Sequence, residues 1–199
     1  MPTSHEIILH LASEHGLIRP RDLALRGIPT VALTRLVRQG RLQRVGRGLY
    51  ALPDRTVSEY SALAEVARKH PNVIVCLLSA LRFHDLTTQS PFEVWLGIPN
   101  KARAPKIDYP PLRILRLSGE ALNLGVEAHV IDGVPVRVTR VARTVADCFK
   151  FRSKVGLDVA LEALREAWRT KRVSMDDLWR DATLCRVANV MRPYMEGLP

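Results

Sequence analysis

The sequence predicts an α+β protein in two parts. An N-terminal group of three helices closed by a hairpin precedes a mixed α/β region with a small sheet and C-terminal helices. Three observations support this class: Gly16, Gly27 and Gly40 each end a short helical pattern, a glycine-rich hairpin pattern follows, and strand-like and helix-like patterns then share the rest of the chain. A Pro-Asp turn signal at residues 53–54 predicts two domains, residues 1–53 and 54–199.

The first two helices have clear end signals. Thr3 and Glu6 have the spacing of a capping box, which predicts a helix from residue 3 or 4 up to Gly16. Pro20 suits the first turn of a second helix, expected over residues 21–26 and ended by Gly27.

A third helix is expected over residues 30–39. The helical period places four apolar side chains on one face: Ala32, Leu33, Leu36 and Val37. The opposite face is polar and basic except for Val31. Arginines and short hydroxyl side chains can contact base edges and phosphates, and a valine methyl can contact a thymine methyl, so this face suits a recognition helix. A solvated helix face would have a similar composition.

The segment after the third helix reads as a β-hairpin. Residues 42–45 and 49–52 are strand-like, and Gly46-Arg47-Gly48 can adopt the positive φ angles of a tight turn. Three helices followed by such a hairpin predict a winged helix-turn-helix, with Arg41, Arg44 and Arg47 on the wing. A winged helix used for protein contacts is the alternative. The predicted DNA contacts are Thr30, Val31, Thr34, Arg35, Arg38, Arg41, Arg44 and Arg47.

Charge supports this interpretation. The chain has 199 residues and a net charge of +10, and residues 1–53 hold eight arginines and three acids, a net charge of +5. Arginine can bind phosphate or a guanine edge with two parallel hydrogen bonds. The three cysteines are widely spaced and are expected to be reduced and buried. No stretch reads as a signal peptide or a membrane span, so we expect a cytoplasmic protein without membrane contact.

The region after residue 53 predicts a mixed α/β arrangement. A helix is expected over residues 58–69 with Ser58 as its cap, a buried strand or helix start over 73–78, a helical continuation over 79–86 and a strand over 92–98. Residues 99–111 form a basic, proline-rich loop. Strands follow at 112–117, 127–131 and 134–138, the last two joined by Asp132-Gly133. Two helices close the chain, one over residues 156–170 with Leu157, Leu161, Leu164 and Trp168 inward, and one capped by Ser174 and Asp177.

No catalytic pattern emerges, and we expect neither enzymatic activity nor a cofactor or metal. Glu93 lacks the following lysine of a restriction-type nuclease site, and no phosphate-binding glycine loop is present. One cluster stands out: in a helix, Arg143 and Asp147 are four residues apart and Thr144 lies beside them. We expect a surface ion pair there. The alternative is a metal-dependent enzyme acting on nucleic acid, with Arg143, Asp147 and Asp85 around the metal.

Three segments resemble the AbiEi-type antitoxins of bacterial abortive-infection and type IV toxin-antitoxin systems. The first is Leu36-Val37-Arg38-Gln39-Gly40-Arg41-Leu42-Gln43-Arg44-Val45-Gly46-Arg47-Gly48-Leu49-Tyr50. The second is residues 136–149 followed by the helix from Gly156, and the third is residues 79–86, which resemble the family's central helix. The resemblance extends over nearly the full length.

This resemblance implies a winged-helix domain that represses its own operon through inverted repeats in double-stranded DNA. It also implies a C-terminal domain that counters a nucleotidyltransferase toxin without forming a stable complex with it. The DNA contacts would then fall on the third helix and the wing. An interaction module that binds an acidic partner through the same basic faces is a further alternative.

Overall fold

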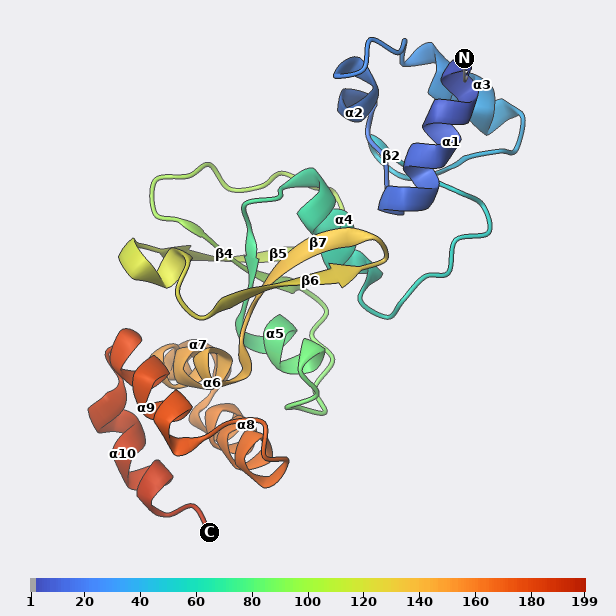
Figure 1. The fold of residues 1–199 in the computed structure, drawn as a ribbon. Coiled ribbons are helices and arrows are strands. Elements are labelled where there is room, and N and C mark those ends of the chain that lie inside the picture. Colours follow the sequence, from blue (N-terminus) through green and yellow to red (C-terminus); the bar gives the residue numbers. More distant parts are fainter. Residues whose placement is uncertain (1–2) are drawn as a thin grey trace. The chain divides into compact units, whose positions relative to one another are not determined.

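The computed structural model describes residues 3–199 as two compact units (Figure 1). One unit contains the chain up to Lys69 together with Val130–Pro135, and the other contains His70–His129 and Val136–Pro199. The first unit therefore includes a helix beyond the hairpin. The boundary expected after residue 53 stays a prediction.

From residue 3 onwards, the first unit contains four helices and a two-stranded hairpin: α1 (Ser4–His15), α2 (Pro20–Ala24), α3 (Val31–Arg38), β1 (Gln43–Gly46), β2 (Leu49–Ala51) and α4 (Ser61–Lys69). The capping box predicted at Thr3 and Glu6 is present, and Gly16 with φ 64° ends α1. The α2 helix ends at Ala24, earlier than expected. The α4 helix begins at Ser61, so the prediction that Ser58 caps it is wrong.

The apolar faces of α1, α2 and α3 form the core of this unit. Ile8, Leu23, Leu33 and Leu36 are at most 1% exposed, and they pack together with Leu42, which precedes the hairpin. The predicted apolar face of α3 is confirmed at Ala32, Leu33 and Leu36. The opposite face of α3 is therefore free of packing.

The second unit is built on a five-stranded sheet with strand order β5-β4-β3-β7-β6. Its strands are β3 (Ile74–Val75), β4 (Val94–Pro99), β5 (Leu112–Leu117), β6 (Val126–Ile131) and β7 (Val134–Thr139). β4 runs parallel to β5 and antiparallel to β3, and β3 runs parallel to β7. The predicted turn at Asp132-Gly133 has positive φ at both residues, 49° and 77°. The expected strand at residues 92–98 begins two residues later, and Phe92 is exposed.

Helices make up the rest of the second unit (Figure 1). They are α5 (Leu77–Phe83), η1 (Gly119–Leu122), α6 (Val141–Lys150), α7 (Arg152–Val155), α8 (Leu157–Arg169), α9 (Met175–Leu184) and α10 (Ala188–Glu196). The capping box predicted at Ser174 and Asp177 is confirmed. The α10 helix is not among the predicted elements. No helix among the described residues combines the length and apolar composition that a bilayer crossing requires.

The predicted inward face of α8 is confirmed at Leu164, holds in part at Leu161 and Trp168, which pack against the core, and is wrong at Leu157. The helix buries Val159, Ala160, Ala163, Leu164 and Ala167. Leu161 and Trp168 are only partly buried, and Leu157 is 38% exposed. The face of α8 that carries the small alanine side chains is turned toward the core that this helix shares with α6. Small side chains allow two helices to approach closely.

Candidate nucleic-acid interface

The outward face of α3 consists of exposed hydroxyl and guanidinium side chains. Thr30, Thr34, Arg35 and Arg38 are exposed, and Val31 is 52% exposed. The Thr30 hydroxyl makes no capping hydrogen bond, so it is available to an external partner. Within residues 3–199, neither Arg35 nor Arg38 forms an ion pair.

The hairpin after α3 is short and ends in a two-residue turn. Arg44 pairs with Tyr50 and Gly46 with Leu49, and a bulge lies between Arg44 and Gly46. Arg47 and Gly48 form the turn, and Gly48 has φ 69°. The prediction of positive φ is therefore confirmed at Gly48 and wrong at Gly46, which remains in the strand.

The wing holds its arginines outward. Arg41, Arg44 and Arg47 are all exposed. The Arg44 Nε donates to the Gly46 carbonyl at 3.3 Å, which directs that side chain along the hairpin. The pKa of Glu6 is lowered, first by hydrogen bonds from Thr3 and to a lesser degree by the charge of Arg41.

A third strand-like segment stabilises the hairpin. The N–H of Ile18 donates to the Tyr50 carbonyl at 2.9 Å, and the N–H of Tyr50 donates back to the Ile18 carbonyl at 3.0 Å. This bridge connects the α1–α2 linker to the wing. A bridge of this length has no periodicity, so the sequence contained no signal for it.

Arg19 and Arg68 are partly buried and are both paired with Asp22, so they are less available to a partner than the exposed arginines. Arg19 donates to both oxygens of Asp22, from its backbone N–H at 2.8 Å and from Nη2 at 2.9 Å. Arg68 of α4 donates to Asp22 at 2.6 Å, and Arg26 donates to the Asp22 carbonyl. Burial alone would raise the pKa of Asp22, but the hydrogen bonds from Arg19 and the charges of Arg68 and Arg19 lower it. This network fastens α4 to α2.

The Arg143 cluster on α6 is buried, so the expectation of a surface ion pair is wrong. Arg143 Nε donates to Asp147 at 3.0 Å, and the two side chains are 1% and 3% exposed. The guanidinium also donates to the carbonyls of Leu124 and Ala121. Burial raises the pKa of Asp147, and the adjacent Arg143 opposes that shift. The other Asp147 oxygen accepts from the Cys185 thiol at 3.3 Å.

Thr144 belongs to a separate buried chain of hydrogen bonds. Its hydroxyl lies 2.8 Å from that of Thr139 and donates to the Thr139 carbonyl. The same carbonyl lies 2.7 Å from the His84 Nε2. Burial lowers the pKa of His84. Arg143, Thr144 and Asp147 thus connect α6 to its neighbours in the core.

The residues proposed for a metal site do not form one. Each oxygen of the buried Asp147 carboxylate accepts a hydrogen bond, one from Arg143 and one from Cys185, whereas the Asp85 side chain is 75% exposed and lies 3.9 Å from Arg82. Among the described residues, no group of three or more His, Cys, Asp or Glu side chains could hold a metal ion. All three cysteines are free and buried, as predicted.

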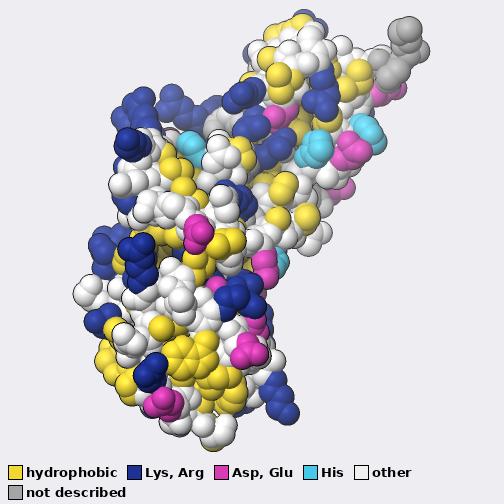
Figure 2. Space-filling model, turned by 60° about the vertical axis from the view of Figure 1, so that its left-hand side comes forward, with side chains coloured by type: hydrophobic (Ala, Val, Ile, Leu, Met, Phe, Trp, Pro, Cys, Tyr) yellow, Lys and Arg dark blue, Asp and Glu magenta, His cyan; other side chains and the backbone are white. Residues whose placement is uncertain are grey.

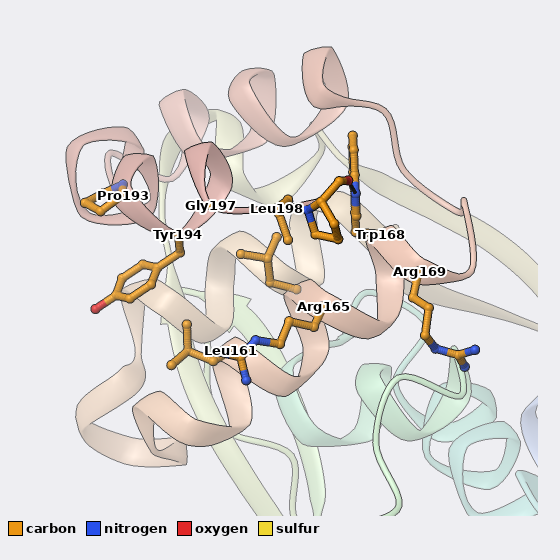
Figure 3. Close-up of a pocket in the computed structure, with 10 residues that line it drawn as sticks. Leu161, Arg165, Trp168, Arg169, Pro193, Tyr194, Gly197 and Leu198 are labelled. Carbon is orange, nitrogen blue, oxygen red and sulfur yellow. Dashed lines mark hydrogen bonds between the residues drawn. The ribbon is translucent and has the colours of Figure 1, made fainter.

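A pocket of about 470 Å³ lies between α8, α10 and the residues after α10 (Figure 3). Leu161, Trp168 and Tyr194 line it, and the Trp168 Nε1 donates to the Pro199 carbonyl at 2.9 Å. Figure 3 shows Arg169 directed away from the leucines, and this side chain is held by Glu166 at 2.6 Å. The lining of this pocket is mostly apolar, unlike the basic surface of α3 and the wing.

Residues 6–53 match a family described as a transcriptional regulator, AbiEi antitoxin. The resemblance expected from the sequence is therefore confirmed over this segment, and so is the winged-helix fold class. The matched segment contains α3, the wing and all eight predicted DNA-contact residues. No curated protein matches the chain.

Proposed function

We propose that the protein, whose N-terminal segment matches AbiEi antitoxin regulators, is a sequence-specific regulator that binds double-stranded DNA and represses its own operon. The operator would contain inverted repeats. The protein would act in the cytoplasm, without a cofactor and without catalytic activity. Its C-terminal domain, residues 54–199, would counter a nucleotidyltransferase toxin without a stable complex.

The observation on which the DNA proposal rests is the outward face of α3. An exposed, unpaired arginine can donate to guanine O6 and N7 together, and Arg35 and Arg38 are both in this state. Thr30 and Thr34 add hydroxyl groups, and Val31 adds an exposed apolar surface for a thymine methyl. We assign sequence reading to this helix.

The wing supports a different contribution. Arg41 precedes the short hairpin, Arg44 lies in its first strand and Arg47 in its turn, and all three side chains are exposed. Contacts of this kind fall mostly on phosphates, which fix the register of a protein on the duplex without reading sequence. We assign positioning to the wing.

The antitoxin half of the proposal depends on the family description and on the sequence resemblance of residues 79–86 and 136–149. In the folded chain these segments form α5, the end of β7 and most of α6. The Arg143 cluster lies among them and is buried, so its part in antitoxin activity would be to hold this unit together rather than to touch a partner.

Fluorescence anisotropy with two duplexes tests the regulator proposal. One duplex has the sequence upstream of the protein's own coding region, and the other is a random sequence of equal length. We expect the first to bind about 10³-fold more tightly at physiological salt. Equal affinity for both duplexes would favour the alternative, an interaction module that binds an acidic partner. In that case the protein should bind poly-glutamate beads, and added DNA should compete poorly with the beads.

A further inference from the structure

The α8 helix carries two apolar faces. The face buried in the core consists mostly of small side chains: Val159, Ala160, Ala163, Leu164 and Ala167. Beside it, Leu161 and Trp168 pack against the core only in part, and Leu157 is 38% exposed. These three residues are spaced four and seven positions apart, so they share one side of the helix. Core packing does not fully account for this second face, because apolar surface left in water costs free energy.

The second face of α8 contributes to the pocket of about 470 Å³ that lies between α8, α10 and the residues after α10 (Figure 3). Leu161 and Trp168 of this face line the pocket together with Tyr194 and Leu198. In the lower part of Figure 2, where the C-terminal helices lie, apolar side chains gather in one area. Sites for small molecules have volumes of about 300–1,000 Å³ and mostly apolar walls, so this pocket has the size and the lining of such a site.

The aromatic side chains of the pocket are held in place. The Trp168 Nε1 donates to the Pro199 carbonyl at 2.9 Å. The centroid of the Tyr194 ring lies 5.5 Å from that of Phe149, which is fully buried. Because these walls are already ordered, a ligand that enters the pocket immobilises few side chains, and this lowers the entropic cost of binding.

The charged side chains at the pocket are both arginines. Among the described residues that line the pocket, none is Asp or Glu. Arg169 is bonded to Glu166, whereas Arg165 is exposed and forms no hydrogen bond or ion pair within residues 3–199. Figure 3 shows the Arg165 side chain running toward Leu161, at the end of the pocket away from Trp168. This end therefore carries an unpaired positive charge beside apolar side chains.

We propose that this α8–α10 pocket (Leu161, Arg165, Trp168, Tyr194 and Leu198) binds a small monocarboxylate with an aliphatic body. The Arg165 guanidinium binds the carboxylate with two parallel hydrogen bonds, and the aliphatic body lies along Leu161 toward Trp168. A neutral molecule of the same shape would leave Arg165 unpaired, and a cationic one would be repelled. A solvated arginine on an exposed helix face would explain Arg165, but it would not explain the second apolar face of α8.

The test is a titration of the full chain with octanoate, octanol and octylamine, which share one chain length and differ in charge. The readout is the indole N–H signal of Trp168 in the NMR spectrum of isotope-labelled protein. The chain has three tryptophans, and the Trp168 signal is the one that Trp168→Phe removes. We expect octanoate to shift this signal at concentrations about tenfold lower than octanol, because a hydrogen bond to a charged group adds to the apolar contact. Octylamine is expected to bind most weakly.

Two substitutions separate the contribution of the charge from that of the apolar wall. Arg165→Gln is expected to weaken octanoate about tenfold and to leave octanol unchanged. Leu161→Asn is expected to weaken both compounds, and urea unfolding checks that this variant folds. The matched control is Arg103→Gln, which removes an exposed arginine elsewhere in the same unit and is expected to change neither affinity.

The proposal is overturned if octanoate does not shift the Trp168 signal, if octanol binds as tightly as octanoate, or if Arg103→Gln loses as much affinity as Arg165→Gln. A Trp168 signal that moves when the protein is diluted without any ligand would assign the pocket to a second copy of this chain, and this too would overturn the proposal. Because the titration contains no DNA, failure here leaves the proposed regulator function standing.

Discussion

Arginine is used in opposite ways on α3 and on α6. Arg35 and Arg38 are exposed and unpaired within the described residues, whereas Arg143 is 1% exposed and bonded to a carboxylate and two carbonyls. Both helices are amphipathic: Arg38 follows Thr34 by four residues on α3, and Arg143 precedes Asp147 by four residues on α6. The contrast teaches that the burial and pairing of an arginine, more than the composition of its helix, decide its role. An exposed, unpaired arginine is available for binding, whereas a buried arginine must have its hydrogen bonds satisfied within the core.

The largest effect is expected from breaking the buried pair. Arg143→Ala leaves Asp147 buried without its partner and is expected to lower the free energy of unfolding by about 3–5 kcal/mol. Urea unfolding measures it. The matched control is Glu166→Ala, which removes an ion pair whose arginine side chain is 72% exposed, and it is expected to cost far less, because solvent screens an exposed ion pair. Equal losses in the two variants would contradict the claim that burial makes the Arg143 pair important for stability.

A smaller loss of stability is expected in the first unit, and it depends on pH. The pKa of Asp22 is lowered in the folded protein, so its carboxylate contributes stability above the unfolded value of about 3.9, and this contribution is lost as the pH falls through the folded pKa. At pH 7, Asp22→Asn is expected to cost about 1–3 kcal/mol. The difference from wild type should shrink below about pH 4, as measured by urea unfolding at several pH values. Asp54→Asn, on an exposed side chain, is the control for the loss of a carboxylate.

A substitution on the exposed face of α3 should affect DNA recognition rather than the stability of the fold. Arg38→Ala is expected to change the free energy of unfolding by less than about 0.5 kcal/mol. It should reduce discrimination between the operator and single-base variants of it by about 1–3 kcal/mol at one position. Anisotropy with a panel of operator variants measures this. With folding intact, a loss that is equal for every duplex would show that Arg38 does not read a base.

The smallest effect is expected at the wing tip. Arg47→Ala should weaken operator and random duplexes by the same factor and should reduce the salt slope by about 0.9, the value for one phosphate contact. Salt titrations with both duplexes measure the two slopes. A loss confined to the operator would instead assign base reading to the wing.

Local signals predicted the helices of the N-terminal segment well. The capping boxes at Thr3 and Ser174 and the buried face of α3 depend on residues three or four positions apart, and such contacts are visible in a sequence. The boundaries shifted where the end signal was weak, as at Ser61. The exposed state of Arg35 and Arg38 followed from the same periodicity.

What the sequence left open depends on contacts between distant segments. The Arg143 pair was expected at the surface because its burial is produced by Leu124, Ala121 and Cys185, which are 19 to 42 residues away along the chain. The face of α8 was predicted only in part: three leucines and a tryptophan gave the stronger hydrophobic stripe, yet the helix mainly buries valine and alanine side chains together with Leu164. The bridge between Ile18 and Tyr50 likewise joins two segments that have no shared pattern.

The central claim is that α3 reads the operator and the wing holds the backbone. The most direct measurement is the ratio of own-promoter to random-duplex affinity at fixed salt, for the wild-type protein and for Arg35→Ala. The account predicts a high ratio for the wild type that falls at least tenfold in Arg35→Ala, with an unchanged free energy of unfolding. A ratio near 1 for the wild type, or a ratio that Arg35→Ala leaves unchanged, would contradict it.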